Sequence, residues 1–246
     1  MNENFGDLRA ASADAHARQS FVTRLFDDLA PHYDRFNRWV SFHRDEAWRR
    51  NTIAQLGPRA GGIVLDLAAG TGALAQNALQ HGAASVHVFD ISLPMLLLAK
   101  DKLRRDSTRV ALELGSAHLL PFRDASFDGV VSGFAMRNVF HFLDEVLQEI
   151  HRVLKPGGRA AILEMSRPQN RIVRSMFLLH MKTVMPLVGK LASGKTQPFA
   201  YLFDTTMSFL SPQDFKKRLE NAGFVDVGWK PQLLGGIAIH FGSKPA

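Results

Sequence analysis

The stretch GIVLDLAAGTGALAQNALQHG, residues 62–82, changes its pattern in the middle. Its first part is a short apolar run, and its second part spaces apolar residues as a helix does. Gly70 and Gly72 stand between the two parts, and Gly82 closes the second part as a glycine closes a helix. The stretch therefore predicts a strand, a tight turn and a helix, the repeating unit of a parallel α/β sheet.

The same alternation continues along the chain. Further strands are predicted at 85–91, 110–117, 127–136 and 159–166, followed by a pair at 224–231 and 235–244 that can run antiparallel. Helices are predicted at 93–105, 142–154 and 211–223. We expect a Rossmann-like α/β fold, with a mostly parallel sheet that ends in an antiparallel strand pair.

The domain plan has one folded unit. Residues 1–19 are predicted to be a flexible N-terminus, and residues 20–246 a single domain. Within this domain, 20–56 is a helical arm with a turn at 30–37. Residues 170–208 are a helical insertion that can act as a lid.

Composition narrows the class of protein. The chain has 246 residues, of which 46% are hydrophobic and 22% charged, as in soluble globular proteins. It has no cysteine, which excludes disulfides and thiolate metal sites, and no secretory h-region is visible. The longest apolar stretch, 176–192, includes two lysines, a histidine and a proline and so fails as a membrane span. We expect a cytoplasmic protein.

The net charge of +7 is unevenly spread. Residues 165–203 contain no acid and the basic residues Arg167, Arg171, Arg174, Lys182, Lys190 and Lys195. Basic residues among Met, Phe, Leu and Val suit anionic lipid headgroups, which indicates peripheral contact with the inner face of a membrane. A solvated basic face explains the segment equally well. No nucleic-acid motif is present, so we expect no nucleic-acid partner.

The glycine turn satisfies a nucleotide-binding pattern. Gly70, Gly72 and Ala75 fit G-x-G-x-x-G/A, and Asp90 lies twenty residues beyond Gly70. Both a dinucleotide and S-adenosylmethionine would use such glycines, and both would place ribose hydroxyls on Asp90. A turn without any ligand is the third possibility.

Asp66 separates the two cofactors. It ends the first strand, four residues before Gly70, so its carboxylate would lie close to the ligand. A pyrophosphate would be repelled by this carboxylate, whereas the ammonium and sulfonium groups of S-adenosylmethionine would be attracted. Asp66 therefore favours S-adenosylmethionine over a nicotinamide dinucleotide.

Several longer motifs resemble those of class I methyltransferases, and more narrowly the UbiE-type C-methyltransferases of ubiquinone and menaquinone biosynthesis. The resemblance extends from Phe21 to the end. The motifs are FDDLAPHYDRFNRWVSF, AWRR, LDLAAGTGALA, VFDISLPMLLLAKDKL, GSAHLLPFRDASFDGVVSGFAMRNV, EIHRVLKPGGRAAILEMSRP, AYLFDTTMSFLSPQDF, ENAGF and GGIAIH. It implies the class I methyltransferase fold and S-adenosylmethionine as cofactor, with S-adenosylhomocysteine as product. It also implies a demethylated quinol as substrate, of the demethylmenaquinol or polyprenyl-methoxy-benzoquinol type.

The resemblance implies a set of cofactor-binding residues: Asp66, Gly70, Thr71, Gly72, Asp90, Ile91, Ser116, Ala117 and Gly133. The chain departs from the family at three positions. Ala73 stands where members usually have Asp, and Gly133 where they often have Ser. Ser116 replaces an Asp or Asn that contacts the adenine amine, although its hydroxyl can still accept a hydrogen bond.

Arg137, Asn138 and Tyr33 are the candidate catalytic residues. Arg137 and Asn138 follow the strand at 127–136, at the sheet edge where α/β folds bind ligands. A fixed cation there would favour the anion of a hydroquinone, and Asn138 would orient the ring. Alternatively, Arg137 caps the next helix or pairs with an acid at 144–145.

The resemblance places Tyr33 over the active site, where its hydroxyl could reach the methionine carboxylate or a substrate oxygen. Simple packing on the arm is the alternative for this residue. The histidines have no metal-ligand spacing, so no metal is predicted. His141 and His240 can line the pocket or sit in ordinary structure.

Three functions remain open. The first is C-methylation of the quinol, and the second is methylation of another small phenolic or lipid acceptor. The third is a cofactor-binding, non-catalytic subunit of a membrane-associated assembly, which the departures at Ala73 and Ser116 would permit. The sequence leaves the quinol, its tail length and the number of subunits open.

Overall fold

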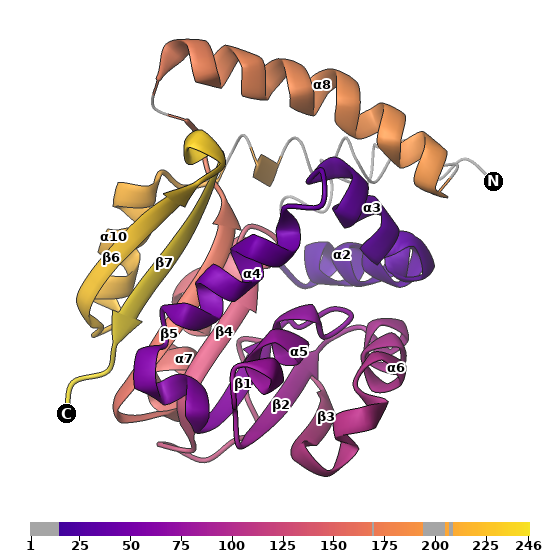
Figure 1. The fold of residues 1–246 in the computed structure, drawn as a ribbon. Helices are drawn as coiled ribbons and strands as arrows, with labels where there is room; N and C mark the ends of the chain where they lie inside the picture. Colours follow the sequence, from indigo (N-terminus) through magenta and orange to yellow (C-terminus); the bar gives the residue numbers. More distant parts are fainter. Residues whose placement is uncertain (1–14, 169, 194–204, 207–208) are drawn as a thin grey trace.

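A computed structural model describes residues 15–168, 170–193, 205–206 and 209–246. Within these residues, seven strands form one sheet in the order β3-β2-β1-β4-β5-β7-β6 (Figure 1). The strands are β1 (Ile63–Leu67), β2 (Ser85–Asp90), β3 (Val110–Leu114), β4 (Phe127–Gly133), β5 (Leu154–Met165), β6 (Val225–Gln232) and β7 (Ile237–Ser243). Strands β1 to β5 are parallel, while β7 is antiparallel to both β5 and β6. The predicted fold class is confirmed, and the last strand of the chain is inserted between β5 and β6.

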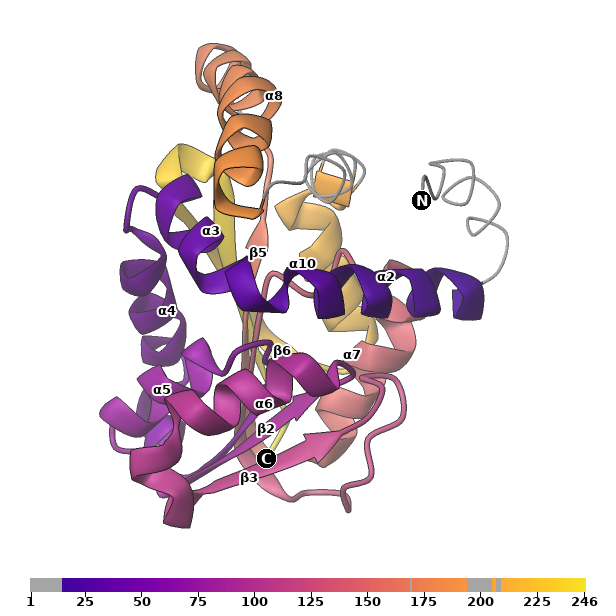
Figure 2. The same cartoon turned by 90° about the vertical axis from the view of Figure 1, so that its right-hand side faces the viewer.

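Helices form two layers and a cover. They are α2 (Ala15–Leu29), α3 (Tyr33–Val40), α4 (Asp45–Ala54), α5 (Ala73–Gln80), α6 (Leu93–Lys102), α7 (Leu143–Val153), α8 (Arg171–Ser193) and α10 (Pro212–Asn221). Short 3-10 turns are η1 (Ala30–His32), η2 (Gly57–Gly61), η3 (Arg104–Arg109), η4 (Phe140–Phe142) and η5 (Leu233–Gly235). Helices α4, α5 and α6 pack on one face of the sheet and α7 and α10 on the other, while α2, α3 and α8 lie beyond the carboxyl ends of the parallel strands (Figure 2).

The two cores follow from strand alternation in β1. Val64 is fully buried in the cluster that includes Leu74 of α5, whereas Leu65 is buried in the cluster that includes Leu147 of α7. Successive side chains of a strand point to opposite faces. Asp66 lies two residues after Val64 and therefore on the same face of the sheet, so its carboxylate points toward α5 rather than toward α7.

The helix starts agree with the sequence. Ser92 caps α6, because its hydroxyl accepts a hydrogen bond from the backbone N–H of Met95, and Pro94 lies in the first turn. Ser211 caps α10 in the same way through the N–H of Asp214. The helix expected at 211–223 is thereby confirmed, and it ends before Gly223, which has a φ of 93°.

The arm differs from the prediction in two places. Residues 15–19, expected to belong to a flexible N-terminus, are the first turn of α2. The expected turn at 30–37 is confined to η1, since α3 begins at Tyr33. Both segments are helical because α2 and α3 bury Val22, Leu29 and Phe36 in one apolar cluster with α8, a tertiary contact that local sequence does not reveal.

The insertion is described in part. Helix α8 covers residues 171–193 and contributes Phe177 to the cluster shared with the arm. Residues 194–204 and 207–208 of the predicted lid, and residues 1–14 of the predicted N-terminus, lie outside the described residues.

Gly72 allows a test of how tightly the glycine turn is built. Its φ is 73°, and a Cβ there would lie 3.1 Å from side-chain atoms of Ala99 in α6 and of Leu103, which directly follows that helix. We expect Gly72→Ala to lower the free energy of unfolding by about 2 kcal/mol, from left-handed backbone strain plus crowding. The melting temperature measured by calorimetry should fall by about 4–8 °C.

Gly57→Ala is the matched control. Gly57 has a φ of 59°, and a Cβ there would meet nothing within 4 Å. It should cost only the backbone strain, about 1 kcal/mol. Equal losses in the two variants would mean that the turn and α6 accommodate a methyl group without crowding.

Candidate functional site

Adjoining cavities follow the carboxyl ends of β1, β2 and β4. We name them by position: the β2 cavity beside Asp90, the loop cavity beside Asp66, the central cavity between them, and the apolar cavity beneath α3 and α8. The β2 cavity comprises about 520 Å³ of empty space and the apolar cavity about 730 Å³, and both are partly open to solvent. Tyr33 lines the loop, central and apolar cavities, so it stands where they meet.

Asp66 is a buried carboxylate at the loop cavity. Its Oδ2 accepts the backbone N–H of Ala75 at 2.8 Å, in the first turn of α5, while its Oδ1 is buried without a hydrogen-bond partner among the described residues. Desolvation raises the pKa of Asp66 to about 7. The Ala75 N–H lowers it, nearby Asp90 raises it, and the charges of Arg49 and Lys102 lower it. An unpartnered, desolvated acceptor of this kind suits a cation.

Asp90 holds the glycine turn in shape. Its Oδ2 accepts the N–H of Gly70 at 2.7 Å, and its Oδ1 accepts the N–H of Ser92 at 2.8 Å. Desolvation raises the pKa of Asp90, and the N–H groups of Ser92, Gly70 and Ile91 oppose that rise. Asp90 and Ile91 both line the β2 and central cavities, as expected for residues that meet a ribose.

Thr71 connects the turn to the arm. Its hydroxyl donates to Oδ1 of Asp34 at 2.6 Å and accepts from Nζ of Lys102 at 2.8 Å, and Lys102 also pairs with Oδ2 of Asp34 at 2.7 Å. Thr71 lines the loop cavity together with Gly70. Gly72 caps α5 in the left-handed conformation and, unlike them, does not line this cavity.

Tyr33 reaches the turn from the arm. Its ring packs edge-on against Phe26 with centroids 6.1 Å apart, and its Cε1 would lie 3.8 Å from a Cβ at Gly70. The structure therefore brings Tyr33 next to the predicted cofactor loop, as the sequence analysis expected.

Arg137 is paired with a residue that the sequence analysis missed. Its guanidinium, 7% exposed, donates through Nη1 to Oε1 of Glu164 at 2.5 Å and to the carbonyl of Phe134 at 2.8 Å. Glu164 is fully buried in β5. The alternative acid partner Asp144 pairs instead with Arg218. The side chain of Arg137 lines the apolar cavity, so a buried ion pair forms part of its wall.

Asn138 and Gly133 face the central cavity. The Asn138 amide donates through Nδ2 to the carbonyl of Phe134 at 3.2 Å, and its Oδ1 is buried without a partner among the described residues. Gly133 also lines the loop cavity, where a Cβ would lie 3.0 Å from Leu74. A serine at Gly133 would thus be crowded by the side chain of Leu74.

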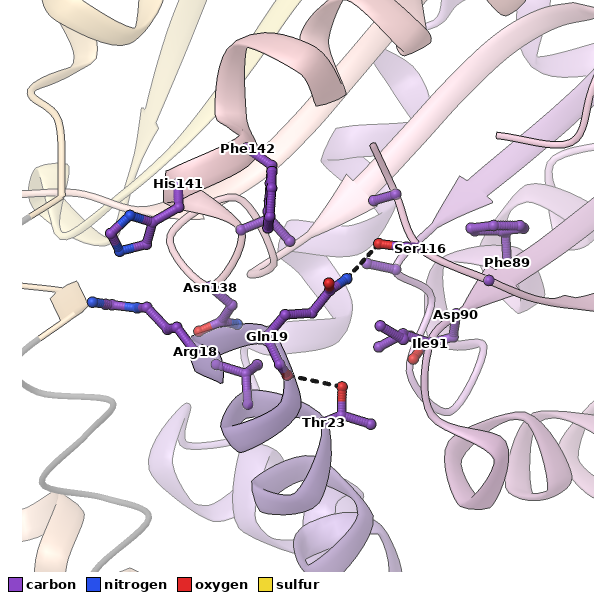
Figure 3. A pocket seen from close by; sticks show the side chains of 15 residues that line it. Arg18, Gln19, Thr23, Phe89, Asp90, Ile91, Ser116, Asn138, His141 and Phe142 are labelled. Atoms are coloured by element: carbon purple, nitrogen blue, oxygen red, sulfur yellow. Dashed lines mark hydrogen bonds between the residues drawn. The ribbon is translucent and has the colours of Figure 1, made fainter. Parts of the chain in front are cut away.

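Ser116 and Ala117 line the β2 cavity after strand β3 (Figure 3). The Ser116 hydroxyl accepts a hydrogen bond from Nε2 of Gln19 and lies 2.9 Å from Nδ1 of His118. Gln19 comes from α2, 97 residues earlier in the chain. Gln19 was not predicted as a site residue because it lies in the segment expected to be flexible.

Arg49 is a further buried cation that sequence analysis did not single out. It is 8% exposed, pairs through Nη1 with Asp45, and lines both the loop and apolar cavities. A guanidinium has further N–H donors, so at this wall it can also meet a carboxylate of a ligand. The sequence offered one signal for a buried Arg49: it directly follows Trp48 and lies on the same helix face as Ile53.

The two histidines considered from sequence have different surroundings. His141 lines the rim of the β2 cavity, and desolvation, followed by the charge of Arg18, lowers its pKa. His240 is 2% exposed and stacks edge-on against Phe215 of α10 at 4.6 Å, on the face away from the cavities. Desolvation lowers the pKa of His240 to about 3, so it is neutral at ordinary pH.

The donor set fits S-adenosylmethionine. Asp66 offers an unpartnered oxygen to an ammonium group, Arg49 can meet a carboxylate, and Asp90 stands at the end of β2 for ribose hydroxyls. Gly70 leaves the wall between them without a side chain. A pyrophosphate would face two buried acids at this edge, which disfavours a dinucleotide.

Comparison with known proteins agrees with this fit. Residues 13–244 match the model of the ubiE/COQ5 methyltransferase family. The chain is 39% identical to a demethylmenaquinone methyltransferase of Lactiplantibacillus plantarum over 231 residues, 92% of this chain and 96% of the relative. It is 37% identical to the ubiquinone/menaquinone biosynthesis C-methyltransferase UbiE of Geobacter sulfurreducens over 227 residues, 91% and 88% of the two chains.

Solved structures share the fold at lower identity. A methyltransferase in complex with the Trm112 activator of Haloferax volcanii aligns with a TM-score of 0.62 at 20% identity, over 90% of this chain and 98% of that one. Phosphoethanolamine N-methyltransferase 2 of Haemonchus contortus, solved with S-adenosyl-L-methionine, aligns with a TM-score of 0.59 at 17% identity, over 80% and 52% of the chains.

Asp66 generates a pH-dependent prediction. Because its pKa is raised to about 7, the carboxyl becomes neutral as the pH falls through 7, and affinity for a cationic ligand should fall with it. We expect Asp66→Asn to weaken S-adenosylmethionine about 100-fold at pH 8, since a desolvated charge pair is lost, and to flatten the pH dependence. Isothermal calorimetry from pH 5.5 to 8.5 measures both effects.

Asp101→Asn is the control, because Asp101 is an exposed acid on α6 whose partner is Arg104. Its affinity profile should match that of the unchanged protein. An unaltered affinity in Asp66→Asn, or a profile with no inflection near pH 7, would remove Asp66 from the cofactor site.

Proposed function

The chain belongs to the ubiE/COQ5 methyltransferase family and is an S-adenosylmethionine-dependent methyltransferase, and on that premise we propose that it methylates a ring carbon of a demethylated, tail-bearing quinol. One observation supports an apolar, tail-bearing quinol as the substrate. An apolar cavity of about 730 Å³ adjoins the cofactor loop at Tyr33 and has a buried arginine in its wall.

The names of the relatives support the quinol. Relatives from Lactiplantibacillus plantarum and Symbiobacterium thermophilum are both called demethylmenaquinone methyltransferase, at 39% and 36% identity. The lining of the apolar cavity supports a ring with a hydrocarbon tail. It is formed largely by Phe36, Val40, Trp48, Phe134, Met165, Phe177, Leu233 and Ile237.

The reaction requires an electron-rich ring carbon. S-adenosylmethionine, when bound, supplies an electrophilic methyl group whose leaving group is a neutral thioether. The protein must therefore align the acceptor, exclude water and increase electron density on the ring. Ionising a hydroquinone oxygen supplies that density, and a fixed cation beside the oxygen favours the ionised form.

Arg137 is suited to this electrostatic task. Guanidinium does not act as a base at ordinary pH, but it stabilises an anion beside it. Glu164 and the Phe134 carbonyl together hold Nη1, while Nε of Arg137 is buried without a partner among the described residues. A donor that is held in place but not satisfied can bind a substrate oxygen without reorganisation. We assign orientation of the ring to Asn138 and closure of the site to Tyr33.

The test is an acceptor panel with labelled S-adenosylmethionine. We expect label in demethylmenaquinol or a demethylated benzoquinol, attached to carbon, and none in simple phenols or amine lipids. Transfer to oxygen or nitrogen would support another acceptor class. Tight binding of S-adenosylhomocysteine without turnover on any quinol would identify a non-catalytic subunit.

The variant Arg137→Gln tests whether this guanidinium contributes to methylation of the quinol. Turnover of the quinol should fall about 100-fold, the usual loss for one preorganised donor, with S-adenosylhomocysteine affinity unchanged. Since a single change leaves Glu164 buried and unpaired, the double variant Arg137→Gln with Glu164→Gln serves as the variant that preserves folding. Arg218→Gln, at an exposed ion pair, is the control. Full turnover in the double variant would exclude the electrostatic role.

We further propose that α8 rests on anionic lipid, the reservoir of a tailed quinol. Its outward stripe is apolar and exposed, formed by Ile172, Met176, Leu179 and Leu187. Phe177 and Val188 occupy the other side of the helix, in the cluster shared with the arm. Arg171, Arg174 and Lys182 supply positive charge along the helix. None of the described helices is apolar enough over a sufficient length to span a bilayer, so a surface contact is the form proposed.

A variant with Met176→Asp and Leu179→Asp tests this contact. Losing two apolar side chains and adding two charges should weaken binding to phosphatidylglycerol vesicles at least ~10-fold in a flotation assay. Turnover of a tailless quinol should be unchanged. Leu97→Asp, at an exposed leucine of α6, is the matched control. Equal flotation of all three proteins would refute the contact while leaving the reaction untouched.

A further inference from the structure

The β2 cavity is the compartment for the adenine base. The ribose position is given by Asp90, which lines both the β2 and central cavities. The charged methionine end belongs at the loop cavity beside Asp66. The base must then extend past Ile91 into the β2 cavity, whose walls include Phe89, Ala117 and Phe142. Flat apolar walls suit a purine ring.

Besides Asp90, the polar side chains that line this cavity are those of Arg18, Gln19, Thr23, Ser116, Asn138 and His141. Ser116 contributes one hydroxyl, at the end of β3. Adenine presents an amine donor next to a ring-nitrogen acceptor, and it does so on each of two edges. A single hydroxyl cannot match both groups of an edge at once, whereas a carboxamide offers one acceptor and one donor with the matching spacing.

Gln19 supplies such a carboxamide. Figure 3 shows its side chain extending from α2 across the cavity, with the amide directed at Ser116. The contact joins Nε2 of Gln19 to Oγ of Ser116, which itself lies 2.9 Å from His118 Nδ1. His118 stacks on Phe142 with centroids 4.1 Å apart, which holds the imidazole beside the serine hydroxyl.

We propose that Gln19 is the residue that recognises the adenine of S-adenosylmethionine, with Ser116 as its supporting hydroxyl. On cofactor binding, the amide oxygen accepts from the exocyclic amine and Nε2 donates to the neighbouring ring nitrogen. The serine side chain is too short to contact both groups of the base, whereas the longer glutamine side chain can contact both. Base recognition then comes from the helical arm rather than from the sheet.

The arm is held firmly enough for this role. Asp27 of α2 accepts the hydroxyl of Ser92 at 2.5 Å, and Ser92 is two residues from Asp90. Val22, 8% exposed, packs inward one turn from Gln19. The hydroxyl of Thr23 donates to the carbonyl of Gln19 at 3.0 Å. Helix α2 is thus tied to the edge of the cofactor site about two turns beyond Gln19.

The test compares two ligands in calorimetry. Gln19→Ala should weaken S-adenosylhomocysteine about tenfold, because the carboxamide contact is lost. The same substitution should weaken the purine-riboside analogue, which carries hydrogen in place of the exocyclic amine, by less than about threefold, since that ligand keeps only the ring-nitrogen acceptor. Ser20→Ala, at an exposed neighbour on the same helix, should change neither affinity.

A second variant separates recognition from helix stability. Ser116→Asn places a carboxamide at the end of β3, so the double variant with Gln19→Ala should recover most of the lost S-adenosylhomocysteine affinity. Three results would overturn the proposal: tighter binding in Gln19→Ala, equal losses for both ligands, or no recovery in the double variant. The inference rests on the cofactor and not on the quinol, and no acceptor is present in these measurements. Its failure would therefore leave the proposed substrate standing.

Discussion

The buried carboxylate of Asp66 is the constraint on which the site depends. One of its oxygens fixes the first turn of α5 through the N–H of Ala75, and the other has no partner among the described residues. The strand, the turn and the helix are thus joined by a group that is itself destabilised by desolvation, as its raised pKa records. A cationic ligand would relieve that cost, and we therefore propose that the residue that fixes the turn also selects the cofactor.

The arm is bound directly to the glycine turn and to the start of α6. Asp27 binds Ser92, and Asp34 binds both Thr71 and Lys102, so two acids of the arm hold the segments that surround the glycine turn. Each contact is a charge-assisted hydrogen bond at a partly buried position, where such bonds are strong. Helices α2 and α3 are consequently held over the carboxyl ends of the parallel strands, beside α8.

The buried pair of Arg137 and Glu164 illustrates how a cation can be kept at an apolar wall. An arginine alone would be expelled from a cavity lined by aromatic and aliphatic side chains, because removing its charge from water is costly. Glu164 compensates that cost from the adjacent strand β5. The guanidinium remains next to the apolar cavity, and its Nε is buried without a partner among the described residues.

The sequence by itself determined the sheet, the glycine turn and the cofactor class, because strand alternation, the helix caps at Ser92 and Ser211, and the acid at Asp66 are local patterns with local causes. It could not reveal that residues 15–19 are helical, since that helix is stabilised by contacts with α8 and the cofactor edge. Nor could it pair Gln19 with Ser116, 97 residues apart, or Arg137 with Glu164 on a neighbouring strand. Only the tertiary structure decided these partners, because a buried polar group is satisfied by whatever the fold brings beside it, and spacing along the chain carries no record of that neighbour.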